Sequence, residues 1–204
     1  QQVMAMQAVP ATNFIYADAA GNIGMFYNAR FQQRATGFDW KGVLPGDTSK
    51  AVWKSYVPFA GYPQVINPPS GWVANSNNTP FIATAPGDNL DASKFAPELG
   101  IETFITNRAM RFQSLIAALG DAPIGRDTLL AIKYDKAYDR ASWAGERQRE
   151  VLALDFKDAP DLAKAQKLLS SWDFVQDGQG DADALAAVMV NSVSMLAYFG
   201  DAMP

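Results

Sequence analysis

Three asparagines lie within four positions of one short segment, Asn75-Ser76-Asn77-Asn78-Thr79-Pro80. An asparagine carboxamide donates two hydrogen bonds through its nitrogen, so it can stabilise the negatively charged oxygen of a tetrahedral intermediate. The same residues also suit a plain turn, because asparagine tolerates left-handed backbone conformations and bonds to neighbouring backbone groups. The segment therefore predicts either a site that stabilises an oxyanion or an asparagine-rich turn.

Charged residues form two further groups that could bind a ligand. Arg108 and Arg111 are three positions apart, which places them on one face of a helix. Their guanidinium groups could bind a carboxylate or fix a neighbouring loop through paired hydrogen bonds, and the alternative is a solvated helix face. Asp88 and Asp91 could hold a metal ion, but two separated carboxylates serve equally well as turn or helix-capping residues.

Aromatic residues are frequent in the middle of the first half of the chain. They could line an apolar ligand pocket, or they could pack an irregular segment. The set comprises Trp40, Trp53, Tyr56, Phe59, Tyr62 and Trp72.

The composition excludes several kinds of catalytic machinery. The 204 residues contain no cysteine and no histidine, so this chain cannot form a thiol nucleophile, a Ser-His-Asp triad or a histidine-ligated metal site. Its 17 basic and 21 acidic residues give a net charge of −4, which argues against nucleic acid as a partner. The apolar runs are too short and interrupted to cross a membrane. The hydrophobic share of 49% is ample for a packed core.

The elements that must position these residues change in character along the chain. Strand-forming runs at Asn13–Ala17 and Ile23–Asn28 flank a turn signal and predict a β-hairpin. Residues 35–71, rich in glycine, proline and tryptophan, predict a long irregular excursion. Helical spacing follows, with Gly120 and Gly200 as stops of the first and last of these segments: Ile101–Leu119, Arg126–Tyr138, Ala141–Ala153, Asp161–Trp172 and Ala182–Phe199. We therefore predict an α+β fold, β-rich over residues 1–87 and mainly helical over residues 88–204.

Several motifs follow one another along nearly the whole chain: Asn13–Asp18 with Gly21–Gly24, Arg34–Trp40, Leu44–Ser49 with Trp53, Asn67–Val73 with Asn75–Pro80, Arg108–Arg111 and Leu168–Asp173. Taken in this order, they resemble the β-chain of penicillin acylase-type N-terminal-nucleophile (Ntn) hydrolases. The PGDTS-like stretch at Leu44–Ser49 is similar to the subgroup that contains aculeacin acylase and acyl-homoserine-lactone acylases.

This resemblance implies an Ntn-hydrolase αββα sandwich and a mechanism. A serine at the start of the mature β-chain attacks an amide carbonyl with its own α-amino group as base, so histidine and cysteine are not needed. By position, Asn77 is the oxyanion-hole residue and Arg108 supports the site. Asn75 is a neighbouring partner of Asn77, and Thr12 falls where relatives place a residue of the acyl-binding pocket.

Gln1 does not match the nucleophile, which in this family lies well upstream of the hairpin. We therefore expect residues 1–204 to be a central β-chain segment that is inactive alone. Its partners would be the remaining α- and β-chain segments of the same acylase precursor. The family's calcium ion could use ligands near Asp88 and Asp91, and no other cofactor is expected. The resemblance also implies zymogen processing and a periplasmic or secreted location.

The expected reaction is hydrolysis of the amide of an N-acylated small molecule. Candidate substrates are acyl-homoserine lactones, penicillins and acylated lipopeptides, which would give the protein a role in quorum quenching or antibiotic conversion. The PGDTS-like stretch favours aliphatic acyl chains over phenylacetyl. The alternative is a non-catalytic binding or structural module that keeps the acylase scaffold.

Overall fold

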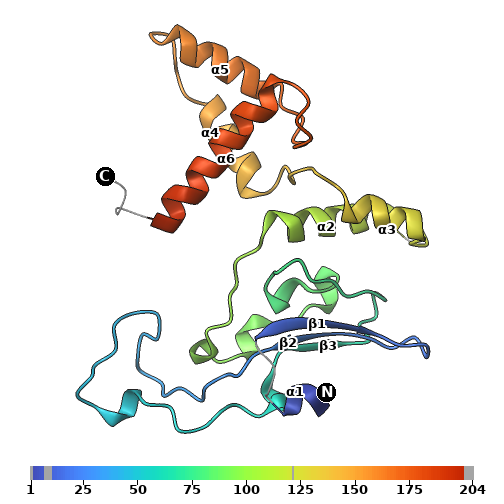
Figure 1. The fold of residues 1–204 in the computed structure, drawn as a ribbon, viewed down its shortest axis with the longest axis vertical. Helices are drawn as coiled ribbons and strands as arrows, with labels where there is room; N and C mark the ends of the chain where they lie inside the picture. Colours follow the sequence, from blue (N-terminus) through green and yellow to red (C-terminus); the bar gives the residue numbers. More distant parts are fainter. Residues whose placement is uncertain (1, 7–10, 121, 200–204) are drawn as a thin grey trace. The chain divides into compact units, whose positions relative to one another are not determined.

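A computed structural model describes residues 2–6, 11–120 and 122–199 of the chain. The chain divides into two compact units, residues 1–105 and residues 106–204 (Figure 1). The first contains a small antiparallel sheet and short helical turns, and the second is helical. Residues 88–105, predicted as part of the mainly helical region, contain short 3-10 turns and belong to the first unit.

The sheet of the first unit is built on the predicted hairpin. Strands β1 (Thr12–Ala17) and β2 (Ile23–Asn28) pair antiparallel, with Thr12 opposite Asn28 at the open end. A short strand β3 (Gln64–Ile66) pairs with the other edge of β2, so the strand order is β1-β2-β3. The prediction that residues 35–71 are wholly irregular is therefore wrong at β3, because three residues are too few to show an alternating pattern.

Hydrogen bonds to one carboxylate close the hairpin turn. The Asp18 carboxylate accepts hydrogen bonds from the backbone N–H groups of Ala20 and Asn22 and from the Asn22 side chain, each 2.9 Å long. These bonds, mainly those from Asn22, hold the pKa of Asp18 below its usual value. Gly21 has a φ of 85°, a left-handed conformation that glycine adopts without steric cost. The turn therefore fixes the register of the two strands.

Strand β2 carries the core of the first unit. Met25 and Val65 are buried with Ala83, while β1 at the sheet edge leaves Ile15 and Tyr16 each 49% exposed. The chain between β2 and β3 leaves the sheet as a long loop and returns to it (Figure 1). The described part of the first unit also contains six 3-10 turns: η1 (Ser49–Ala51), η2 (Phe59–Gly61), η3 (Pro80–Ile82), η4 (Pro86–Asp88), η5 (Ala92–Lys94) and η6 (Pro97–Leu99).

In the second unit, a helix lies at each of the predicted places. The helices are α2 (Asn107–Leu119), α3 (Arg126–Lys133), α4 (Trp143–Leu152), α5 (Pro160–Ser170) and α6 (Asp181–Phe199), while α1 (Gln2–Ala5) belongs to the first unit. Helix α3 ends at Lys133 and not at Tyr138. Helix α2 begins six residues later than its apolar spacing suggests, because the Thr106 hydroxyl caps it by accepting from the Ala109 N–H at 3.2 Å. Gly120 ends α2 as expected, whereas the stop predicted at Gly200 lies outside the described residues.

Helices α4, α5 and α6 pack around one apolar core. Trp172 stacks on Phe174 with ring centroids 4.4 Å apart, and Ala144, Leu169, Ala186 and Val190 complete the buried cluster. Among the described residues, the helices are too short or too polar to cross a membrane.

Candidate functional site

The asparagine-rich segment forms a turn in which Asn77 stands at the surface. Asn77 has a φ of 55°, a left-handed conformation that asparagine adopts more readily than most residues. Its backbone N–H donates a 3.0 Å hydrogen bond to the Oδ1 atom of Asn75. The segment is therefore an asparagine-rich turn, and it holds Asn77 at an exposed position.

A buried asparagine fixes the base of this turn. Asn78 is only 7% exposed, and its Oδ1 atom accepts a 2.6 Å hydrogen bond from the Ser76 N–H. Its Nδ2 atom donates to the carbonyl oxygens of Thr79 at 2.8 Å and Ile82 at 3.4 Å. Thr79 and Pro80 are also buried, and they open the 3-10 turn η3. The turn thus has a rigid base beneath an exposed asparagine.

A fourth asparagine, which was not among the residues predicted for the site, joins the turn to the sheet. The Nδ2 atom of Asn13, on β1, donates a 2.9 Å hydrogen bond to Oδ1 of Asn75. Oδ1 of Asn75 thus accepts hydrogen bonds from both Asn13 and the Asn77 N–H. Thr12, the expected acyl-pocket residue, precedes Asn13 and lies exposed at the start of β1. Asparagine is depleted in strands. The presence of Asn13 in an otherwise apolar, strand-forming run was therefore the sequence signal that could have pointed to this residue.

The two acidic residues considered as metal ligands act as hydrogen-bond acceptors. Asp88 accepts a 2.7 Å bond from the Ser70 N–H, and Asp91 accepts bonds from the backbone and hydroxyl of Ser93. The bonds from Ser93 lower the pKa of Asp91. No group of three or more metal-ligating carboxylates occurs in the described part of the chain. These two carboxylates therefore do not by themselves fit a calcium site.

The two arginines of the second unit differ in their surroundings. Arg108 is exposed in the first turn of α2. Arg111 forms a two-fold ion pair with Asp135, in which its Nε and Nη2 atoms each lie 2.8 Å from a carboxylate oxygen. This pairing raises the pKa of Arg111 and lowers that of Asp135. Arg111 therefore joins α2 to the segment that follows α3, and Arg108 is the more exposed of the two arginines.

A second carboxylate anchors the same helix. The Ser114 hydroxyl donates a 2.5 Å hydrogen bond to the buried Asp139. The backbone N–H of Asp139 donates to the side-chain oxygen of Asn107 at 2.8 Å. Because Asn107 immediately precedes Arg108, these contacts fix the helical turn from which Arg108 projects.

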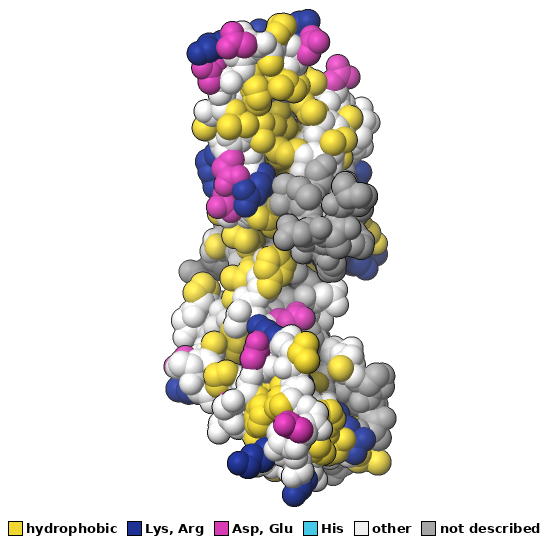
Figure 2. Space-filling view, turned by 90° about the vertical axis from the view of Figure 1, so that its left-hand side faces the viewer, with side chains coloured by type: hydrophobic (Ala, Val, Ile, Leu, Met, Phe, Trp, Pro, Cys, Tyr) yellow, Lys and Arg dark blue, Asp and Glu magenta, His cyan; other side chains and the backbone are white. Residues whose placement is uncertain are grey.

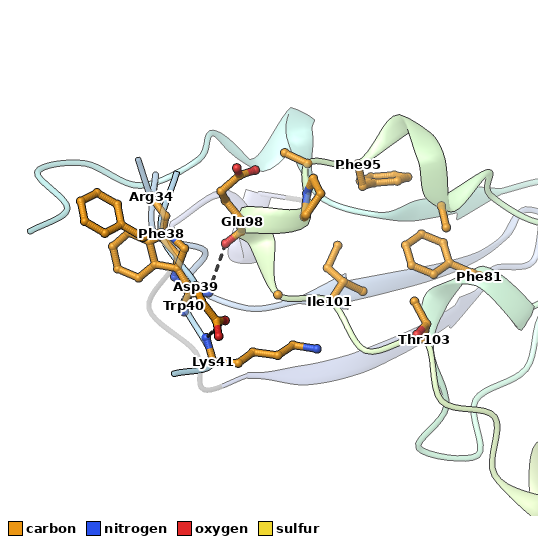
Figure 3. A pocket seen from close by; sticks show the side chains of 14 residues that line it. Arg34, Phe38, Asp39, Trp40, Lys41, Phe81, Phe95, Glu98, Ile101 and Thr103 are labelled. Atoms are coloured by element: carbon orange, nitrogen blue, oxygen red, sulfur yellow. Dashed lines mark hydrogen bonds between the residues drawn. The ribbon is translucent and has the colours of Figure 1, made fainter. Parts of the chain in front are cut away.

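The first unit also contains an aromatic cavity of about 420 Å³ (Figure 3). Phe81 and Phe95 form one wall with ring centroids 5.5 Å apart, and Trp40 lies on the Arg34 side. Arg34 donates a 3.1 Å hydrogen bond to the Glu98 carbonyl and lies over the Trp40 ring. Trp40 is the member of the predicted aromatic set that lines this cavity, and others pack on one another, as Phe59 and Tyr62 do at 5.4 Å.

Apolar side chains are also exposed outside this cavity. Figure 2 shows hydrophobic side chains at the surface on one face of the molecule. In the first unit, Ile15, Tyr16 and Ile66 are each 49% exposed. The edge of the sheet is therefore less covered than its central strand.

A family model described as penicillin amidase matches residues 1–202. The chain belongs to the penicillin amidase family. The motifs at Asn13–Asp18, Asn75–Pro80 and Arg108–Arg111 all fall within the matched region. The resemblance inferred from the sequence is therefore confirmed at the level of the family.

Curated proteins of this penicillin amidase family resemble parts of the chain. Penicillin G acylase of Escherichia coli is 43% identical over 79 residues, which are 39% of this chain and 9% of that protein. The acyl-homoserine lactone acylase QuiP of Pseudomonas fluorescens strain Pf-5 is 29% identical over 177 residues, 84% of this chain and 21% of that protein. Penicillin acylase 2 proenzyme of Pseudomonas sp. strain SE83 is 35% identical over 66 residues, which are 32% of this chain and 8% of that protein.

A solved structure shares the fold of this family member. Thermostable penicillin G acylase from Alcaligenes faecalis matches with a TM-score of 0.58 and 22% identity, over 88% of this chain and 30% of that chain. The predicted α+β fold of the Ntn-hydrolase kind is therefore confirmed. The chain spans less than a third of the length of each of these relatives.

Proposed function

We propose that residues 1–204 are one segment of an acylase that hydrolyses the amide bond of N-acylated small molecules. The turn at Asn77 carries the proposal, because it presents a carboxamide at the surface on a fixed base. The penicillin amidase family match across residues 1–202 supplies the reaction class. In this proposal Asn77 donates a hydrogen bond to the oxyanion, and Arg108 supports the site.

The proposed reaction proceeds through an acyl-enzyme. The hydroxyl oxygen of a serine in another segment of the protein attacks the amide carbonyl carbon, while the serine's α-amino group accepts the hydroxyl proton. The carbonyl oxygen becomes negatively charged, and the Nδ2 atom of Asn77 donates a hydrogen bond to it. The proton then passes to the departing amine as the C–N bond breaks, and water hydrolyses the ester that remains. This sequence of steps needs no cofactor.

The substrate class follows from the chemistry that the relatives share. One relative is named for penicillin G and another for acyl-homoserine lactones, and both names denote removal of an acyl group from an amide nitrogen. The acyl-homoserine lactone acylase aligns with 84% of this chain, which supports an aliphatic acyl group. We assign Thr12 to the acyl-binding pocket, because it lies exposed beside the strand residue that contacts Asn75. The partners are the remaining segments of the same precursor, and export from the cytoplasm is part of the proposal.

The test is a hydrolysis assay on the full-length protein that contains this segment. Acyl-homoserine lactones with six to twelve acyl carbons, penicillin G and an acylated lipopeptide are supplied, and the amine released is quantified. The proposal predicts release of amine from at least one of these amides, and a much slower release by the Asn77→Gly variant. A mature protein that binds an acyl amide without cleaving it would instead identify a non-catalytic module.

A further inference from the structure

The geometry points to Asn13 as a positioning residue for this reaction. We propose that its carboxamide links strand β1 to the turn at Asn75 and so keeps Asn77 in the orientation that receives the oxyanion. The inference rests on the proposed function, because it concerns the same oxyanion donor. Asn13 acts through Asn75 and does not touch the reacting atoms.

Asn13 and the backbone of Asn77 share one acceptor atom. Oδ1 of Asn75 accepts one hydrogen bond from Nδ2 of Asn13 at 2.9 Å and another from the Asn77 N–H at 3.0 Å. A carboxamide oxygen has two lone pairs, so these two donors satisfy it. If the Asn75 amide were turned over, its NH₂ group would face two donors. Asn13 therefore selects the amide orientation that the Asn77 backbone requires.

Asn75 and Asn77 need a fixed contact outside the turn to stay rigid. Asn75 and Asn77 are both exposed, so the side chain of Asn75 would gain rotational freedom without a fixed contact. Asn13 supplies that contact from within the sheet, where it pairs with Tyr27 on the central strand. The side chain of Asn13 thus fixes the position of the turn relative to the sheet. Loss of this link would leave Asn77 attached to its buried base but free to reorient.

Asn13 is the chain neighbour of Thr12, the residue proposed for the acyl-binding pocket. Both belong to strand β1, so a shift of the strand that follows contact between an acyl chain and Thr12 would also move Asn13. We expect the contribution of Asn13 to depend on the acyl chain, and to be greatest for chains that fill the pocket.

The first experiment compares Asn13→Ala and Asn13→Asp in the full-length acylase, with acyl amide substrates of several chain lengths. We expect Asn13→Ala to lower kcat about ten-fold while KM changes less than two-fold. Asn13→Asp should lower kcat further, although it conserves volume. An aspartate cannot donate to Asn75, and it favours the turned-over amide that opposes the Asn77 N–H. Active-site titration corrects kcat for the amount of folded enzyme.

Asn22→Ala is the matched control at the opposite end of the same hairpin. It removes hydrogen bonds to Asp18 and from Asn67, so it weakens the same two strands without touching the asparagine turn. If Asn13 served only to stabilise the hairpin, the two alanine variants would lower kcat to the same extent at equal loss of thermal stability. We expect Asn22→Ala to leave kcat unchanged.

A double-mutant cycle separates failure of the inference from failure of the proposed function. If Asn13 acts through Asn77, Asn13→Ala has little further effect on kcat once Asn77→Gly has removed the carboxamide. The role of Asn13 would be overturned if Asn13→Ala lowered kcat equally in the wild-type and Asn77→Gly backgrounds. It would also be overturned if Asn13→Ala and Asn22→Ala had the same kcat. If Asn77→Gly itself leaves kcat unchanged, the proposed function of the turn fails instead.

Discussion

The three substitutions Asn77→Gly, Asn77→Ala and Asn77→Asp separate the chemistry of the side chain from the conformation of the turn. At a φ of 55°, glycine fits without strain, whereas alanine costs about 1 kcal/mol in the left-handed region. Glycine therefore deletes the carboxamide while it preserves the backbone. Loss of one oxyanion donor typically lowers kcat by about 10²–10³, equivalent to about 2.7–4 kcal/mol of transition-state stabilisation.

We expect the glycine and alanine variants to lose kcat equally, by this factor, and the alanine variant alone to lose thermal stability. Asn77→Asp should lose at least as much activity, because its carboxylate repels the developing negative charge. The assay is amine release from an acyl amide by the full-length enzyme, with thermal unfolding recorded for each variant. A glycine variant with wild-type kcat, together with an impaired alanine variant, would refute the donor role and leave Asn77 as a turn residue.

Further predictions concern both units of the chain. The Arg111 ion pair lowers the pKa of Asp135, so its stabilisation is present above the ordinary carboxyl pKa and is lost as the pH falls through the lowered value. Asp135→Asn should therefore lower the free energy of unfolding by about 1 kcal/mol near neutral pH. The thermal midpoint of this variant should approach that of the wild type as the pH falls below about 4. Gly145→Ala should destabilise the protein by about 1–3 kcal/mol, because a methyl group there meets the backbone carbonyl of the preceding loop. Gly87→Ala, at a position with open space, is the control, and thermal unfolding measures both. Thr12→Phe should shift the preferred substrate to shorter acyl chains in a competition assay, and an unchanged profile would remove Thr12 from the pocket.

Local signals in the sequence were sufficient for much of the fold. The hairpin was predictable because strand-forming residues flank a turn that Asp18 and Gly21 favour. Helix α5 was predictable because Pro160 opens it and apolar residues repeat at helical spacing. Strand β3 was not, since its three residues pair with β2 from far along the chain.

The candidate site was predictable only in part, for a physical reason. Asn75 and Asn77 stand out because they are close in the sequence, and the hydrogen bond between them is local. Asn13 lies 62 residues away from Asn75 in the sequence. The hydrogen bond between their side chains is therefore visible only in the three-dimensional structure. Arg111 was expected to bind a carboxylate, fix a loop or face solvent, and only the structure shows that its partner is the carboxylate of Asp135.

The most direct test of the account is the crystal structure of the full-length mature enzyme with a tetrahedral transition-state analogue, such as an alkyl boronate, bound to its nucleophile. We expect Nδ2 of Asn77 to lie about 2.7–3.1 Å from the oxygen that represents the oxyanion. We also expect Asn75 to keep its hydrogen bonds to Asn13 and to the Asn77 N–H. An oxyanion oxygen held by other donors, with the Asn77 carboxamide turned away into solvent, would contradict the account.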